Sequence, residues 1–229
     1  MVDLYILPIL AIAPGIFWLW YFYTRDRYEP EPKSLVVWMF VMGVLVTIPV
    51  AFFQGFISIF IVSTIIMASV VAPIVEEYAK FIVVRRTMYR HPEFNEPMDG
   101  IVYAVAVGLG FASLENVLYV VSAYLQSPAL GAGTLVVRAF LSVPGHAIFA
   151  GMWGYALGIA KFSVPERRQS IILQGLVIAM VLHGLFNFLL GITEVFAIAI
   201  LVFLLVLIPG MWWLIHRRIR QALMRSQFR

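Results

Sequence analysis

The sequence has no cysteine and few charged side chains. Without cysteine it can form neither a disulfide nor a thiolate metal site, and cysteine-based acyl-enzyme chemistry is excluded. Only 12% of its 229 residues are charged and 62% are hydrophobic, which excludes a soluble domain and indicates an integral membrane protein with several spans. The net charge of +4 is spread over short loops and a tail, so nucleic acid is not an expected partner.

Long apolar segments predict an all-α, polytopic bundle of about seven transmembrane helices. The expected spans are Val2 to Tyr23, Leu35 to Phe53, Phe56 to Val84, Asp99 to Leu125, Thr134 to Ala160, Ser170 to Leu190 and Glu194 to Ile215. Gln54-Gly55 is interpreted as a tight external turn between the second and third. The first span has no basic region before it and no small-residue cleavage site after it, which favours a retained helix over a signal peptide. We expect residues 1–229 to form one membrane domain, with a catalytic core at about 56–190.

Basic residues alternate between the connections of these spans. The first, third and fifth connections and the tail at 216–229 carry lysine or arginine, whereas the second, fourth and sixth carry none. The positive-inside rule then predicts an outside N-terminus and a cytoplasmic C-terminus, with the basic tail on anionic lipid head groups. In the first connection, Glu29-Pro30-Glu31-Pro32 is too rich in proline to continue a helix and predicts a stiff, extended segment.

Two adjacent carboxylates, Glu76 and Glu77, lie in an otherwise apolar segment. Each ionisable group inside a membrane helix costs ~2.5 to 3.5 kcal/mol, so partners within the protein are expected. Lys80 lies one helical turn from both glutamates and can pair with one while the other stays available for chemistry. Two close carboxylates in a poorly hydrated site do not both ionise easily, which favours proton exchange with a water molecule. The alternative is a bridge from Glu76 to Lys80 that only joins helices.

Ionisable and amide side chains recur within the later spans: Glu115, Asn116, Arg138, His146, His183 and Asn187. Pro144 is expected to kink its helix and to aim His146. Counting 1.5 Å per residue from the cytoplasmic ends places Glu76 ~12 Å deep and the later glutamate and histidines ~20 to 24 Å deep. Taken singly, Glu115 could reach solvent and either histidine could be a satisfied core residue. Taken together, these side chains predict one shared site.

These residue types suit the hydrolysis of an amide. Glu76 or Glu77 can take a proton from water, while His146 and His183 stabilise the oxyanion of the tetrahedral intermediate. The supporting residues would be Lys80, Glu115, Asn116, Asn187 and Arg138. No serine lies in a G-x-S-x-G setting. Zinc bound by the two histidines and a glutamate stays open, although H-E-x-x-H is absent; otherwise no metal or cofactor is expected.

Five motifs, in order, resemble those of the PrsW family of bacterial membrane proteases. They are Glu76-Glu77-x-x-Lys80, Asp99-Gly100, Phe111-Ala112-x-x-Glu115-Asn116, Gly145-His146-Ala147-x-Phe149-Ala150 and His183-Gly184-x-Phe186-Asn187. A more distant resemblance links the chain to the CAAX prenyl endopeptidases. In those proteins an arginine follows the paired glutamates one position later than Lys80 does here, which favours the PrsW family.

The resemblance implies a multi-pass, glutamate-type protease of the bacterial cell membrane, in contact with membrane lipids. Its implied substrate is a single-pass anti-sigma factor, cut at a first site on the outer side so that later proteolysis releases a sigma factor in a stress response. Three alternatives stay open: a CAAX-protease-like membrane hydrolase with another substrate, a proton-coupled transporter, and a non-catalytic protein that binds a membrane peptide.

Overall fold

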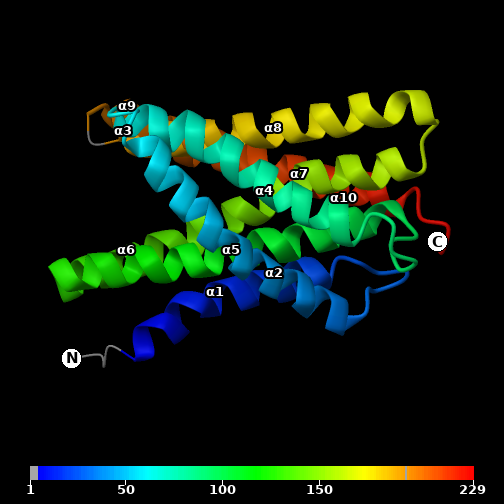
Figure 1. Cartoon of the computed structure of the whole chain (residues 1–229), viewed down its shortest axis with the longest axis horizontal. Helices are drawn as coiled ribbons and strands as arrows, with labels where there is room; N and C mark the ends of the chain where they lie inside the picture. The colour runs from blue at the N-terminus through cyan, green and yellow to red at the C-terminus, as the bar shows by residue number, and fades with distance from the viewer. Residues whose placement is uncertain (1–4, 194) are drawn as a thin grey trace.

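The computed structural model describes residues 5–193 and 195–229, and this part of the chain contains helices and no strand. Figure 1 shows the arrangement of the helices. Their bounds are α1 Ile6–Tyr23, α2 Lys33–Ser58, α3 Thr64–Ile66, the π-helical turn η1 Met67–Val71, α4 Ala72–Thr87, α5 Pro97–Gln126, α6 Pro128–Val137, the π-helical turn η2 Arg138–Ser142, α7 Val143–Lys161, α8 Pro165–Gly191, α9 Ala197–Val202, the π-helical turn η3 Phe203–Leu207 and α10 Ile208–Leu223.

The predicted polytopic helical bundle is confirmed. Among the described residues, six helical segments are long and apolar enough to cross a membrane: α1, α2, α5, α6 to α7, α8, and the segment from Ile198 to Leu223. The unbroken helix at 64–87, which carries the paired glutamates, is the seventh. The expected starts of the first and last spans, Val2 and Glu194, lie outside the described residues.

The predicted turn at Gln54-Gly55 is wrong. Helix α2 continues through both residues to Ser58, and the connection lies at 59–63, where the Ser63 side chain accepts a hydrogen bond from the Ile66 backbone N–H. One glycine inside a helix costs only about 1 kcal/mol relative to alanine. The helix continues because its apolar side chains face lipid and because Gln54 has a partner on α4, described below.

Helix α10 also extends beyond the expected end of the last span at Ile215. It continues to Leu223 and buries Ile219 and Ala222 against the bundle. The first half of the basic tail is therefore an amphipathic helix that packs on the protein.

Helix α5 lies at the centre and packs most extensively against α7. Small residues bring the two backbones together. A Cβ added at Gly108 would lie 2.8 Å from Ala150 Cβ, and one added at Gly154 would lie 2.5 Å from Ala104 Cβ, so neither position has space for a side chain. This close packing holds the first half of α5 against the middle of α7.

Each π-helical turn directly precedes a proline at the second position of the following helix: Pro73, Pro144 and Pro209. Proline cannot donate the backbone hydrogen bond of a regular helix, and its ring clashes with the carbonyl four residues earlier. A wider π turn relieves both problems. The predicted distortion at Pro144 is therefore present, as a π turn ahead of His146.

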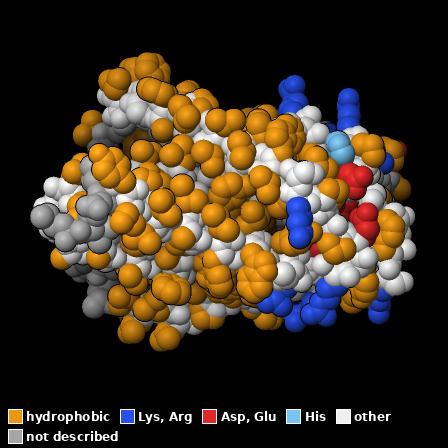
Figure 2. Space-filling model, turned by 90° about the horizontal axis from the view of Figure 1, so that it is seen from below, with side chains coloured by type: hydrophobic (Ala, Val, Ile, Leu, Met, Phe, Trp, Pro, Cys, Tyr) orange, Lys and Arg blue, Asp and Glu red, His pale blue; other side chains and the backbone are white. Residues whose placement is uncertain are grey.

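The connections that carry lysine and arginine all lie at one end of the bundle, which we call the basic end. Figure 2 shows the lysines and arginines gathered at this end and a wide hydrophobic belt over the rest of the face. The positive-inside rule predicts that the basic end is cytoplasmic and the opposite end the outer one.

Candidate active site

Lys80 of α4 is the centre of a buried polar group. Its side chain is fully buried, and its Nζ lies 2.9 Å from Glu77 Oε1, 3.3 Å from Glu76 Oε2 and 3.0 Å from His146 Nδ1. One ammonium therefore contacts both glutamates at once, together with an imidazole from α7. The ring of Phe111 covers the same ammonium, with its centroid 4.0 Å from Nζ.

Glu77 is held by three donors. Besides Lys80, Oε1 accepts a hydrogen bond from His183 Nδ1 at 3.1 Å, and Oε2 accepts one from Trp153 Nε1 at 3.0 Å. The side chain is fully buried. This arrangement fixes Glu77 as a carboxylate in one orientation and leaves it little freedom to take a proton from a substrate water.

Glu76 is held less tightly. Oε2 accepts from Lys80, and Oε1 accepts from Gln54 Nε2 of α2 at 3.2 Å. Both contacts are longer than the shortest one that Glu77 makes with Lys80, and 4% of Glu76 stays exposed where Glu77 has no exposed surface. Of the two carboxylates, Glu76 is the less constrained.

His146 joins the glutamate pair to a second ion pair. Its Nδ1 faces the Lys80 ammonium and must accept, so Nε2 carries the hydrogen and donates to Glu115 Oε2 at 3.1 Å. Arg138 donates to the same oxygen from Nη2 at 2.5 Å and to Asn116 Oδ1 from Nε at 2.9 Å. Glu115 is therefore paired inside the bundle.

His183 presents one ring nitrogen away from Glu77. Its Nδ1–H donates to that carboxylate, which leaves Nε2 as the atom able to accept or, in the imidazolium form, to donate. The ring stacks on Phe149 with centroids 4.5 Å apart. One turn later, Asn187 Nδ2 donates to the Ala68 carbonyl at 2.8 Å and joins α8 to η1 instead of contacting the glutamates.

A polar pocket of about 220 Å³ lies beside these groups. It takes Tyr119 from the second half of α5 and Leu190 and Gly191 from the last turn of α8, and both helices run from the basic end toward the opposite end. The pocket therefore lies toward the end opposite the basic end. Its polar lining residues are Glu115, Tyr119, Arg138, Ser142, His146, His183 and Asn187.

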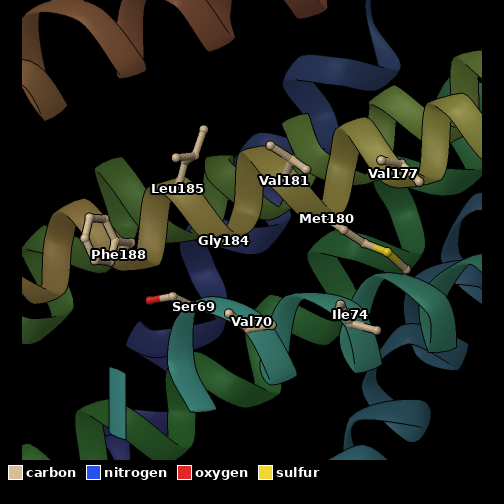
Figure 3. Close-up of a pocket in the computed structure, with 9 residues that line it drawn as sticks. All are labelled: Ser69, Val70, Ile74, Val177, Met180, Val181, Gly184, Leu185 and Phe188. Carbon is tan, nitrogen blue, oxygen red and sulfur yellow. The ribbon is translucent and has the colours of Figure 1, made fainter. Parts of the chain in front are cut away.

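A larger apolar groove of about 500 Å³ lies on the other face of α8, between this helix and the segment from η1 to α4. Figure 3 shows Val181 and Leu185 of α8 on one side, and Val70 and Ile74 on the other. A Cβ added at Gly184 would lie 2.5 Å from the Ser69 carbonyl oxygen. The seam between the groove and the polar pocket is thus closed by backbone contact.

A buried group of Glu76, Glu77, His146 and His183 could hold a metal ion. Each residue offers one ligand atom, and these atoms all lie within 4.8 Å of one another. Imidazole and carboxylate are ordinary zinc ligands, so these four residues fit zinc in kind. The Lys80 ammonium cannot be a ligand, and a metal would have to displace it from its contacts with Glu76, Glu77 and His146. A metal bound there would polarise a carbonyl or lower the pKa of a bound water.

Two residues at this site were not predicted from the sequence, Gln54 and Trp153. Gln54 was assigned to a loop because of the glycine after it. Trp153 is fully buried in α7. Its role could have been suspected from the sequence only because the N–H of a buried indole needs a hydrogen-bond acceptor. Of the predicted residues, the structure brings Lys80 and His183 onto the glutamate pair and His146 onto Lys80. Glu115 contacts His146, and Arg138 and Asn116 join this group through Glu115. Asn187 lines the polar pocket but hydrogen-bonds only the Ala68 backbone.

A bundle of membrane-crossing helices that surrounds buried glutamates, histidines and a polar pocket defines a membrane-embedded hydrolase. Residues 31–214 match the family described as PrsW family intramembrane metalloprotease. The chain belongs to this family, and it is a multi-pass intramembrane protease of the bacterial cell membrane. The transporter and binding-protein alternatives have no comparable support.

Curated relatives cover almost the whole chain. It is 39% identical to Protease PrsW of Geobacillus kaustophilus (strain HTA426) over 214 residues, which is 93% of this chain and 90% of the relative. It is 34% identical to Protease PrsW of Bacillus subtilis (strain 168), over 93% of each chain. Protease PrsW of Clostridioides difficile (strain 630) is 32% identical over 87% of this chain and 84% of its own length. No solved structure matches the chain.

Proposed function

We propose that this protease cleaves a single-pass membrane protein of the anti-sigma factor class, with Glu76 activating the attacking water. The observation that carries this proposal is the convergence of two glutamates and two histidines around Lys80, directly behind a polar pocket. The substrate class follows from the sequence resemblance, and the test below addresses it directly.

In the proposed reaction, Glu76 takes a proton from water, and the resulting hydroxide adds to the carbonyl carbon of the scissile peptide. His183 in its imidazolium form, held through Nδ1 by Glu77, donates from Nε2 to the oxyanion. The protonated Glu76 then returns its proton to the leaving amine as the carbon–nitrogen bond breaks. Lys80 stays an ammonium throughout and balances the charge of the pair.

The position of the pocket favours cleavage near the outer surface. Tyr119, Leu190 and Gly191 line the pocket at the end opposite to the basic end. The apolar groove between α8 and Val70 to Ile74 faces lipid next to it, and it offers the substrate's transmembrane helix a surface of matching chemistry. A peptide bond just outside that helix would then reach the pocket.

The test uses purified protein in liposomes with a single-pass anti-sigma factor as substrate and mass spectrometry of the products. We expect Glu76→Gln to lower the cleavage rate by ~10² to 10⁴-fold, as removal of a general base does. The control is Glu166→Gln, which changes an exposed glutamate in the first turn of α8. Full activity of Glu76→Gln, with its folding verified by the melting temperature, would show that Glu76 is not the general base.

The family description also includes a metal, and the donor set fits zinc. Dialysis against a strong chelator separates the two chemistries. Activity that survives chelation identifies hydrolysis by the protein's own groups. Activity that is lost and then restored by zinc identifies a metal-dependent reaction, for which His146, His183 and a glutamate are the proposed ligands.

A further inference from the structure

A second group of acidic side chains lies at the basic end, far from the polar pocket. We call it the acidic cluster: Asp26, Glu29 and Glu31 of the connection between α1 and α2, together with Glu96 and Asp99 at the start of α5. None of its members has a role in the proposed hydrolysis. On the face that Figure 2 draws, acidic side chains are visible only at this end.

The ligand atoms of the acidic cluster lie close together. One carboxylate oxygen from each of Asp26, Glu96 and Asp99 lies within 4.8 Å of the other two, and the same holds for Glu29, Glu31 and Asp99. Asp99 belongs to both sets. Two connected groups of oxygen ligands are therefore already assembled.

These carboxylates are buried and incompletely satisfied. Asp26 is only 4% exposed, and both of its carboxylate oxygens lack a hydrogen-bond partner, as do Glu31 Oε1 and Asp99 Oδ1. The remaining oxygens of the last two are bound: Tyr103 donates to Glu31 Oε2, and the backbone N–H groups of residues 95 and 96 donate to Asp99 Oδ2. Hydrogen bonds thus hold Glu31 and Asp99 in place, and the oxygens without a partner remain available to a ligand.

No protein cation neutralises the cluster. Within the described part of the chain, none of the five carboxylates forms an ion pair. Lys161, a basic side chain close to Glu31 and Asp99, donates instead to the Phe94 carbonyl. Burial, followed by the neighbouring carboxylates, raises the pKa of Asp26 to about 8, and burial raises that of Glu31 to about 10. Without a cation, these two carboxyls therefore keep their protons near neutral pH, and a bound cation would replace those protons.

We propose that the acidic cluster binds a hard divalent cation of the Mg²⁺ or Ca²⁺ type, which joins the connection between α1 and α2 to the start of α5. The ligands are carboxylate oxygens without histidine or cysteine, and such oxygen-only sets select magnesium, calcium or manganese over zinc. The bound ion stabilises the end of α5 opposite to Glu115. The proposal is independent of the reaction at the polar pocket.

The test follows Mn²⁺ binding to the full-length protein in lipid nanodiscs by electron paramagnetic resonance. We expect an ion in an all-oxygen environment, without the nitrogen modulation that imidazole ligands add, and we expect Mg²⁺ or Ca²⁺ to displace it. Asp26→Asn should weaken this binding at least tenfold. His183→Gln, which alters only the other donor group, and the exposed-site control Glu166→Gln should leave it unchanged.

Thermal unfolding gives a second measurement that does not depend on activity. Saturating Mg²⁺ or Ca²⁺ should raise the unfolding temperature of the wild type by roughly 5 to 10 °C over the chelated protein, and that of Asp26→Asn by much less. The chelated variant should be about as stable as the chelated wild type, because it replaces a buried carboxyl that lacks a hydrogen-bond partner with an amide of the same size; this verifies that it folds. Equal Mn²⁺ binding by wild type and variant would overturn the proposal. The proposal would also be overturned if the wild type bound no Mn²⁺ and were stabilised only by lowering the pH. That result would mean that the carboxyls of the acidic cluster are neutralised by sharing protons and not by a cation.

Discussion

At the residue scale, Lys80 determines whether two glutamates can be buried side by side. Its ammonium is the ion-pair partner of both Glu76 and Glu77. Lys80→Met removes that charge and leaves both carboxylates buried without a cation, which costs ~3 to 5 kcal/mol. We expect loss of cleavage together with a clear fall in the melting temperature.

A second substitution separates the effect of Lys80 on stability from its effect on cleavage. In Glu77→Gln/Lys80→Met the pair loses one charge of each sign, so the melting temperature should recover toward that of the wild type while cleavage stays absent. If the double variant were as unstable as Lys80→Met, the charge argument would be wrong and the lysine would act through packing.

We expect Trp153 to position Glu77, because its indole N–H donates to Glu77 Oε2. Trp153→Phe keeps the aromatic ring that meets Phe81 but removes the N–H that donates to Glu77 Oε2. A hydrogen bond to a charged group contributes roughly 1.5 to 3 kcal/mol, so we expect cleavage to fall about tenfold or more with a small change in melting temperature. Trp213→Phe, at an exposed tryptophan, is the matched control. A steady-state assay that resolves kcat from KM should place the loss in kcat, whereas a purely structural role would show first in the melting temperature.

The sequence was most informative about charged residues. In an apolar segment each charge needs a partner, so Lys80 and the two histidines could be related to the glutamates before any coordinates were known. Gln54 and Trp153 could not be found in the same way. An amide or an indole is common in membrane proteins without a special role, and only the relative rotation of α2, α4 and α7 shows which carboxylate each one faces.

At the element scale, the π turn before α7 sets the direction of His146. The turn at Arg138–Ser142 adds a residue to the helix ahead of Pro144. A regular α-helix through this region would rotate His146 by about 100° relative to α6. The presence of proline was visible in the sequence, but its effect on the backbone, a π turn instead of a simple kink, depends on packing between α5 and α7.

Pro144→Ala therefore tests whether this π turn serves the site. We expect the variant to fold and to lose at least ~90% of cleavage, because His146 would no longer face both Lys80 and Glu115 as it rotates with the helix. Pro209→Ala is the matched control, since Pro209 follows the π turn η3 in the same way but does not line the polar pocket. Equal activity of the two variants would show that the π turn is only a packing adjustment.

Helix ends were harder to predict than helix number. Hydropathy alone ended the second span at Phe53, but α2 continues to Ser58 and thereby carries Gln54 to Glu76. Depth counted from predicted ends separated Glu76 from the histidines by roughly 10 Å, yet Glu77 and His183 are in contact. Counting depth from predicted ends assumes that every span begins at the same level and lies parallel to the membrane normal, and the contact between Glu77 and His183 shows that this assumption is wrong.

At the scale of the whole molecule, the charged side chains that the structure describes outside the buried site gather at one end of the helical bundle. The basic connections and the acidic cluster lie at one end, and the pocket at the site opens toward the other. The basic end was predictable, because loop charges are visible in the sequence. The side of the membrane on which the pocket opens was not, because it depends on how far each helix extends beyond the buried glutamates.

The orientation can be measured directly because the chain has no cysteine of its own. Val62, in the connection between α2 and α3, is 88% exposed, and Val164, between α7 and α8, is 57% exposed. We expect Val62→Cys to react with a membrane-impermeant maleimide in intact cells and Val164→Cys to react only after permeabilisation, since the basic end faces the cytoplasm. Each variant serves as the accessibility control for the other, and cleavage assays verify that both are folded. The opposite pattern would place the polar pocket at the cytoplasmic surface, and the substrate would then have to be cut on its cytoplasmic side.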